Sequence, residues 1–168
     1  MKTFSKNNVR FVFKTELFIG NEIAQALPKH LGDNFWNNIG LVVDKGVYEN
    51  NNYVSELVNL LENQMKKVIL LVNEMPEPTY DYLDKVKWKF EEYGLDCFIG
   101  IGGGSTIDLS KGLATLKTNK KNAIYYRGFG KVTKRPLPVI AIPTTAGSGS
   151  EVTPYAVFID TDENWKFG

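Results

Sequence analysis

Four short, continuous apolar runs constrain the fold of this chain more than any other feature of its sequence. Each run is as long as one β-strand, and apolar residues recur at spacings of three and four in the segments between runs, which is typical of amphipathic helices. Strands that are apolar on both faces and alternate with helices indicate a parallel sheet covered on its two sides. The sequence therefore predicts an α/β fold with a doubly wound, mostly parallel sheet. The predicted strands are Ile39–Val43, Val68–Val72, Cys97–Ile101 and Leu137–Ile142.

The same periodicities predict the remaining elements. Alternating residues in Val9–Phe13 and the run Leu17–Ile19 indicate two early strands, and Asp44–Gly46 is interpreted as a turn. Near the other end, Glu151–Asp160 alternates like a strand, and a turn leads from it into a return strand that begins at residue 165. The predicted helices are Asn21–His30, Tyr53–Leu61, Tyr82–Phe90 and Ser105–Leu116.

The composition excludes several classes of protein. Lys and Arg number 20 against 19 Asp and Glu, and the resulting net charge of +1 excludes a broadly basic nucleic-acid binder. A single cysteine excludes a disulfide framework, and a single histidine, His30, excludes a His-rich metal centre built from this chain alone. We expect His30 to lie in the last turn of its helix, where a cation complements the helix dipole. No apolar run reaches the length of a membrane span or of a signal-peptide core, so we expect a soluble, cytoplasmic protein without a membrane partner.

The segment from Cys97 to Ala114 carries the most chemical information. A buried strand leads directly into Gly102–Gly104, and a helix capped by Ser105 or Thr106 is expected to follow. Glycines let the backbone approach a ligand closely, and a helix start offers free N–H donors and a positive dipole end. The segment therefore predicts an anion site, with phosphate as the expected anion. Tight packing of the helix on the strand is the alternative explanation of the glycines.

This loop differs from two familiar phosphate motifs. No Gly-Lys-Ser/Thr follows at the spacing of a Walker loop, and the usual dinucleotide fingerprint places an acidic residue about 20 residues downstream, where Asn122 lies. Asp44 instead ends the first buried strand, where a carboxylate can accept hydrogen bonds from ribose hydroxyls. A simple turn residue is the alternative interpretation of Asp44.

A second polar loop follows the fourth predicted strand. Several hydroxyl side chains surround two glycines directly after the strand ends at Pro143, and together they offer several donors to one ligand. An ordinary polar loop is the alternative. The hydroxyl residues are Thr144, Thr145, Ser148 and Ser150, around Gly147 and Gly149.

Taken together, the two loops resemble one family closely, the iron-containing (group III) alcohol dehydrogenases. The resemblance rests on GGGSTIDLSK at Gly102–Lys111, IPTTAGSGSEVT at Ile142–Thr153 and LVVDKG at Leu41–Gly46. It implies a Rossmann-like cofactor domain and a distant relation to glycerol dehydrogenases and dehydroquinate synthases. It also implies hydride transfer between an alcohol or aldehyde and NAD, with NADP less favoured. We expect residues 1–168 to form one dinucleotide-binding domain that is truncated at its C-terminal hairpin, without a second domain.

The resemblance also implies a role for individual residues. Asp44 faces the adenosine ribose and disfavours the 2′-phosphate of NADP, whereas Asp108 extends toward the nicotinamide and Lys166 matches a family lysine near the cofactor. A plain surface charge is the alternative for Asp108 and for Lys166. The expected pyrophosphate residues are Gly102, Gly103, Gly104, Ser105 and Thr106. Thr144, Thr145 and Ser148 are expected on the adenine and phosphate side, and Thr153 and Tyr155 near the nicotinamide and substrate.

The metal of this family is iron or zinc, and the resemblance implies ligands, one Asp and three His, from a helical second domain. None of those positions exists in this chain, so we expect it to be inactive alone. The apolar strand Val9–Phe13 predicts a homodimer. Two alternatives stay open: a free-standing dinucleotide-binding module without catalysis, and a lyase or kinase that uses the glycine loop on a sugar phosphate.

Overall fold

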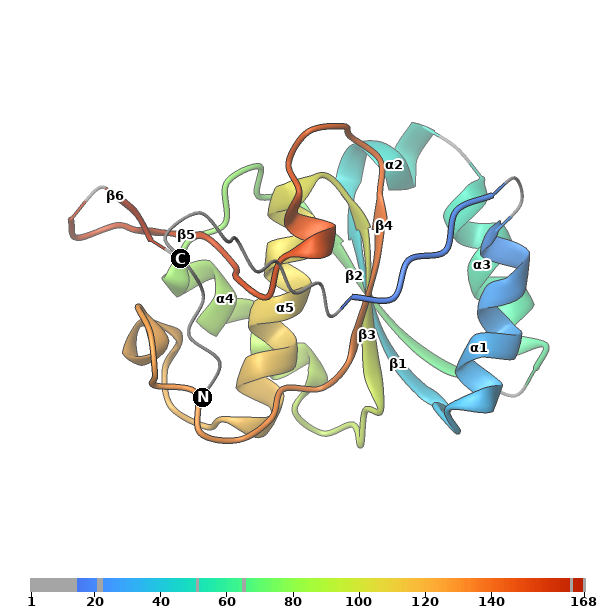
Figure 1. The fold of residues 1–168 in the computed structure, drawn as a ribbon, viewed down its shortest axis with the longest axis horizontal. Helices are drawn as coiled ribbons and strands as arrows, with labels where there is room; N and C mark the ends of the chain where they lie inside the picture. The colour runs from blue at the N-terminus through green and yellow to red at the C-terminus, as the bar shows by residue number, and fades with distance from the viewer. Residues whose placement is uncertain (1–14, 21–22, 51, 65, 164, 168) are drawn as a thin grey trace, which may run out of the picture.

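The computed structural model describes residues 15–20, 23–50, 52–64, 66–163 and 165–167. Its centre is a sheet of four parallel strands in the order β2-β1-β3-β4 (Figure 1). Each of the four predicted strands is confirmed, with ends that differ by one or two residues. The strands are β1 (Asn38–Asp44), β2 (Lys67–Asn73), β3 (Cys97–Gly102) and β4 (Val139–Pro143).

Helices cover both faces of this sheet, which confirms the doubly wound α/β fold (Figure 1). One face carries α1 (Leu27–Asp33) and α3 (Tyr53–Glu62). The other carries α4 (Tyr80–Lys87) and the long α5 (Gly104–Thr118). A short helix, α2 (Lys45–Asn50), follows β1 at the carboxyl end of the sheet.

The alternation of side chains along the strands divides the core into two parts. Leu41 and Ile99 pack with Leu57 beneath α1 and α3, whereas Val42 and Phe98 belong to the cluster beneath α4 and α5. Successive residues of a strand point to opposite faces, so one strand supplies both clusters. Because both faces of the central strands β1 and β3 are buried, their sequences are apolar through the buried length rather than alternating.

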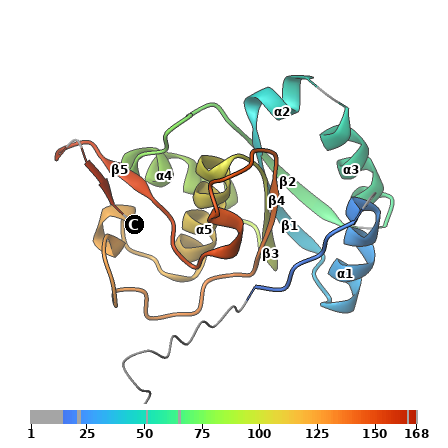
Figure 2. The same ribbon diagram turned by 45° about the horizontal axis from the view of Figure 1, so that its top comes forward.

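A two-stranded hairpin completes the fold. β5 (Phe158–Asp160) pairs antiparallel with β6 (Trp165–Phe167), which confirms the predicted return strand. The N–H of Ile159 donates to the carbonyl oxygen of Pro78 at 3.1 Å, so the hairpin is attached to the segment that precedes α4. Figure 2 shows the hairpin on the α4 and α5 side of the molecule, away from α1 and α3.

Three local predictions are wrong. Leu17–Ile19 forms no strand, and its side chains are exposed. Lys45 already begins α2, because Oδ1 of Asp44 accepts hydrogen bonds from the N–H groups of Gly46 at 2.9 Å and Val47 at 3.3 Å and so satisfies the start of that helix.

The third error concerns Glu151–Asp160, where only the last three residues form a strand. Ser150–Val152 is a 3-10 turn. Nζ of Lys111 donates a hydrogen bond to the carbonyl oxygen of Tyr155, and the carboxylate of Asp108 accepts one from the N–H of Val157. These backbone groups are therefore bonded to helix α5 rather than to a neighbouring strand.

At the N-terminal side, a 3-10 turn over Ile23–Ala26 precedes α1, and His30 lies in the last turn of α1 as predicted. The predicted strand Val9–Phe13, and with it the expected dimer contact, lies outside the described residues. Within the described residues, no helix is long and apolar enough to cross a membrane.

Candidate functional site

The central strands β1 and β3 end where the winding of the sheet reverses. From β1 the chain continues through α3 to β2 on one side, and from β3 it continues through α5 to β4 on the other. Doubly wound sheets bind ligands beyond the carboxyl ends of their strands at such a switch point. Asp44 ends β1 and Gly102 ends β3, and a Cβ atom built on Gly102 would lie only 2.8 Å from Cβ of Asp44. The structure thus brings two of the predicted site residues together at the switch point.

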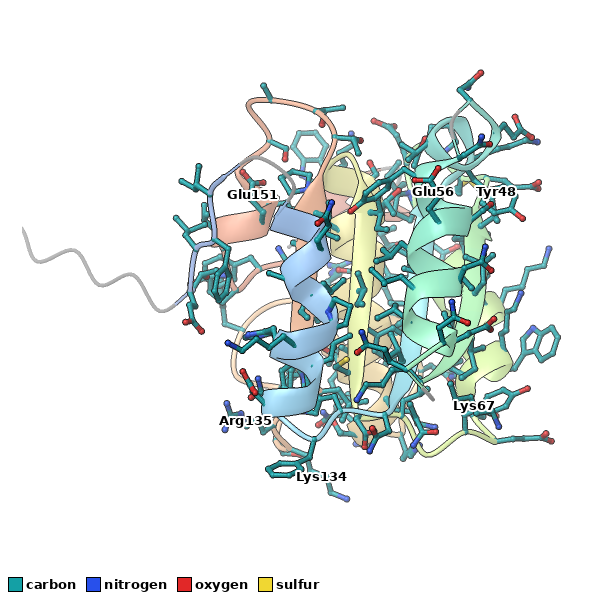
Figure 3. All side chains as sticks on the ribbon, turned by 90° about the vertical axis from the view of Figure 1, so that its right-hand side faces the viewer. Tyr48, Glu56, Lys67, Lys134, Arg135 and Glu151 are labelled. Carbon is teal, nitrogen blue, oxygen red and sulfur yellow. The ribbon has the colours of Figure 1, made fainter. Side chains whose placement is uncertain are left out.

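The two ends of the sheet carry different side chains. Figure 3 shows Tyr48 and Glu151 toward the carboxyl ends of the strands, and Lys67, Lys134 and Arg135 at the opposite end. The labelled basic side chains therefore lie away from the switch point.

Helix α5 begins at the switch point without a side-chain cap. Its N-cap residue is Gly103, so the predicted cap at Ser105 or Thr106 is wrong, and none of the described side chains accepts a hydrogen bond from the first turn. At the start of α4, by contrast, Oγ1 of Thr79 accepts a hydrogen bond from the N–H of Tyr82 at 2.9 Å. The first N–H groups of a helix have no partners within the helix, and the 15-residue α5 adds the positive end of its dipole. The start of α5 is therefore suited to bind an anion.

The loop after β4 packs directly on the glycine loop. The N–H of Thr144 donates to the carbonyl oxygen of Gly102 at 3.0 Å. A Cβ atom on Gly103 would lie 3.2 Å from Oγ1 of Thr145, and one on Gly104 would lie 2.9 Å from Cβ of Ser148. A side chain at Gly104 would force the two loops to shift, and one at Gly103 would crowd Thr145, so the glycines serve the contact between the two motifs as well as access to the helix start.

A cavity of about 220 Å³ lies beside the start of α5. Its walls come from α5, from the loop after β4 and from the β5–β6 hairpin. Five predicted site residues line it, namely Gly104, Ser105, Asp108, Ser148 and Lys166. The other lining residues are Glu77, Pro78, Ser150, Val157, Phe158 and Ile159.

Asp108 and Lys111 form a largely buried ion pair one turn inside α5. Nζ of Lys111 lies 3.2 Å from Oδ1 of Asp108, and the two side chains are 14% and 13% exposed. Oδ1 of Asp108 also accepts a hydrogen bond from the hydroxyl of Ser150, and Oδ2 accepts one from the N–H of Val157 at 3.0 Å. Burial lowers the pKa of Lys111, and the negative charge of Asp108 opposes that lowering. Asp108 is thus neither a free surface charge nor an unengaged carboxylate.

Thr106 faces the interior of the protein. Its side chain is buried, and its Oγ1 accepts a hydrogen bond from Nδ2 of Asn73 at 3.1 Å. The side chain of Asn73 also exchanges hydrogen bonds with the backbone of Met75. Asn73 ends β2 as Asp44 ends β1, so the signal that singled out Asp44, a polar residue directly after a buried strand, also applies to Asn73.

The remaining predicted residues lie at the edges of the site. Oγ1 of Thr153 accepts a hydrogen bond from Nζ of Lys111 at 3.4 Å. Tyr155 is exposed, and its ring lies perpendicular to that of Phe129 with the ring centres 5.7 Å apart. Lys166 forms an ion pair with the carboxylate of Glu77. Sequence reasoning missed Glu77, because it lies between two prolines in a segment without periodicity.

The lone histidine lies elsewhere. The ring of His30 contacts those of Phe18 and Trp36, with ring centres 5.2 and 6.0 Å away. Within the part of the chain that the structure describes, no three His, Cys, Asp or Glu side chains gather as metal ligands.

These features define the class of the protein: a Rossmann-like α/β domain with a glycine loop and an uncapped helix start at its switch point. The sequence profile described as iron-containing alcohol dehydrogenase matches residues 14–168. The chain belongs to this family, as its two loop motifs predicted.

Individual relatives agree with this assignment. The 4-hydroxybutyrate dehydrogenase of Cupriavidus necator is 34% identical over 133 residues, which are 76% of this chain and 34% of the relative. A solved iron-containing alcohol dehydrogenase of Thermotoga maritima has a TM-score of 0.81 at 30% identity, covering 91% of this chain and 42% of that chain. Sulfoacetaldehyde reductase of Bifidobacterium kashiwanohense, solved in complex with NAD+, has a TM-score of 0.76 at 25% identity, covering 88% and 39%. The chain spans about a third of the length of the curated relatives it matches.

Proposed function

We propose that this chain supplies the cofactor-binding part of an NAD-dependent, metal-requiring alcohol dehydrogenase, which transfers a hydride between an alcohol or aldehyde and nicotinamide. The observation that carries the proposal is the uncapped start of α5 at the switch point, faced by the hydroxyl-rich loop after β4. The family assignment and the NAD+ complex of one relative support it.

In the proposed complex, the pyrophosphate lies at the start of α5. The N–H groups of Gly104 and Ser105 donate to its oxygens and Ser148 adds a hydroxyl, while Lys166 offers its ammonium from the hairpin, where it is paired with the carboxylate of Glu77. The cavity of about 220 Å³ is smaller than the roughly 300–1,000 Å³ of a site for a whole drug-sized ligand. We therefore place only the pyrophosphate inside it, with the nicotinamide extending along residues 153–157 and the adenosine over the loop of Thr144 and Thr145.

Asp44 is the proposed determinant of cofactor choice. Its carboxylate is held in place by the N–H groups of Gly46 and Val47, directly beside Gly102. In this position it accepts hydrogen bonds from the ribose hydroxyls and repels a 2′-phosphate, so NAD is preferred over NADP.

Among the described residues, no cluster of His, Cys, Asp or Glu side chains could bind the metal of the family. A bound metal of this kind polarises an alcohol oxygen and lowers its pKa. We place its ligands outside these 168 residues and assign none of its chemistry to this chain. Thr153 and Tyr155 stay predictions for the nicotinamide and substrate side, and the homodimer stays a prediction that sedimentation of the chain at high concentration can test.

Calorimetric titration of the chain with NAD, NADP and ATP, without metal, tests the proposal. We expect micromolar binding that is selective for NAD. Gly104→Ala should weaken it at least tenfold, because the new methyl group meets Ser148 at 2.9 Å, whereas Gly94→Ala is the matched control with nothing within 4 Å of its new methyl group. Asp44→Gly should reduce the preference for NAD over NADP. Absence of NAD binding would contradict the proposal, and equal discrimination by the chain and Asp44→Gly would contradict the ribose assignment.

A further inference from the structure

Lys111 connects helix α5 to residues 150–157, the segment that forms one wall of the cavity. Its Nζ donates to the hydroxyl of Ser150 at 2.9 Å, to that of Thr153 at 3.4 Å and to the carbonyl oxygen of Tyr155 at 2.6 Å, in addition to its ion pair with Asp108. An ammonium has three donors, so these four acceptors engage it fully.

Asp108, the other partner of the ion pair, also binds this segment. One carboxylate oxygen accepts from Ser150 and Lys111, and the other accepts from the N–H of Val157. The pair therefore fastens the segment at Ser150, Thr153, Tyr155 and Val157. Ser150 and Val157 themselves line the cavity.

This segment has little regular structure of its own. Gly147 and Gly149 adopt left-handed conformations with φ of 95° and 67°, and only one 3-10 turn separates them from β5. Without a β-ladder, the position of such a segment depends on its side-chain contacts. Lys111 and Asp108 supply these contacts, and both side chains are largely buried. Because an unpaired buried charge is costly, each of the two charges holds the other in place.

We propose that Lys111 and Asp108 are positioning residues that fix residues 150–157 against α5 and thereby shape the nicotinamide-side wall of the dinucleotide site. The inference rests on the proposed function and deepens it. It assigns Asp108 a role through Ser150 and Val157, since both of its oxygens are engaged by donors of the protein.

The test compares Lys111→Met with Lys117→Met on the same helix. Lys117 is a matched control because its Nζ also donates to backbone carbonyls, those of Phe90 at 2.7 Å and Glu91 at 3.0 Å, but outside the cavity lining. Lys111→Arg serves as the conservative rescue. Thr153→Val removes the hydroxyl contact to Lys111, together with two long hydrogen bonds from that hydroxyl to the carbonyls of Ser150 at 3.4 Å and Tyr155 at 3.5 Å, and provides a second, milder variant if Lys111→Met does not fold.

Titrations with NAD and with AMP provide the readout, since AMP needs only the Asp44 and glycine-loop side. We expect Lys111→Met to weaken NAD binding about tenfold and AMP binding less than twofold, with Lys117→Met changing neither and Lys111→Arg recovering part of the loss. Thr153→Val should weaken NAD binding about twofold. Hydrogen exchange at the Val157 amide should accelerate in Lys111→Met and stay unchanged in Lys117→Met.

The outcomes separate the inference from the function on which it rests. If the unmodified chain binds no NAD, the proposed function and the inference both fail. If the chain binds NAD and every folded Lys111 or Thr153 variant binds it equally well, only the inference fails. Equal losses for NAD and AMP, or equal losses in the Lys111 and Lys117 variants, would show a general loss of stability and would also overturn it.

Discussion

The contact between α5 and the hairpin makes a quantitative prediction at Gly112. This residue is buried inside α5, and a Cβ atom there would lie 2.6 Å from Cζ of Phe158 and 2.7 Å from Cδ2 of Leu83. Carbon atoms in ordinary contact are about 3.5–4.0 Å apart. Each neighbour in Gly112→Ala must therefore move by about 1 Å, and because Phe158 lines the cavity, β5 should move with it.

Two terms decide the magnitude. Replacing a helical glycine by alanine stabilises a helix by about 0.5–1 kcal/mol. Overpacking a well-filled core costs about 1–3 kcal/mol. In Gly32→Ala, in α1, only the helix term applies, since no atom of the described residues lies within 4 Å of the new methyl group. The free energy of unfolding should thus be about 1–3 kcal/mol lower in Gly112→Ala than in Gly32→Ala, a difference in which the helix term largely cancels.

Urea unfolding followed by far-UV circular dichroism measures this difference. We expect equal m-values and a midpoint that is lower for Gly112→Ala than for the unmodified chain, or at most equal to it. In thermal scans, each kcal/mol corresponds to a shift of about 2–4 °C for a chain of this size. If Gly112→Ala gained as much stability as Gly32→Ala, β5 would not be packed on α5 as described, and the wall of the cavity would be misplaced.

Three further predictions concern stability. Burial, and secondarily the negative charge of Asp96, raises the pKa of the Cys97 thiol from 9.0 to about 12. The buried neutral thiol therefore makes its full contribution to stability below about pH 9, and this contribution is lost as the pH rises toward about 12. The excess stability of the chain over Cys97→Ala should shrink by about 1.4 kcal/mol between about pH 8 and 10. A constant difference would contradict the burial. Thr79→Ala should cost about 1 kcal/mol in urea unfolding, because it removes the cap of α4, and Thr79→Ser should cost less. Asn119→Ala should cost about 2 kcal/mol or more, because the buried amide bonds the backbone of residues 115, 133 and 134; a cost below 0.5 kcal/mol would show that these contacts do not hold the segment.

Most of the fold could be predicted because its signals are local. A strand that is buried on both faces must be apolar along its buried length, and β1 and β3 show this directly in their sequences. The predicted strand at Glu151–Asp160 was wrong because alternation alone cannot show which partner takes the backbone hydrogen bonds. Here the partners are Lys111 and Asp108, which lie 44 and 49 residues earlier in the chain than the backbone groups they bind.

The candidate site was predictable in its residue types but not in its contacts. A glycine run after a buried strand, and Asp44 at the end of another, pointed to the switch point without any structure. Whether Thr106 turns toward a ligand or toward Asn73 depends on a residue from β2, and only the packed sheet brings those two together.

Short patterns of apolar, glycine and hydroxyl residues are enough to predict the strand and helix order, the family and a candidate anion site at the start of α5. The contact between the two loops, the hydrogen bonds of Lys111 and Asp108 to residues 150–157, and the ion pair of Glu77 with Lys166 depend instead on the folded structure. Such contacts join residues 39 to 89 positions apart, and their geometry is set by the packing of the helices on the sheet rather than by local sequence.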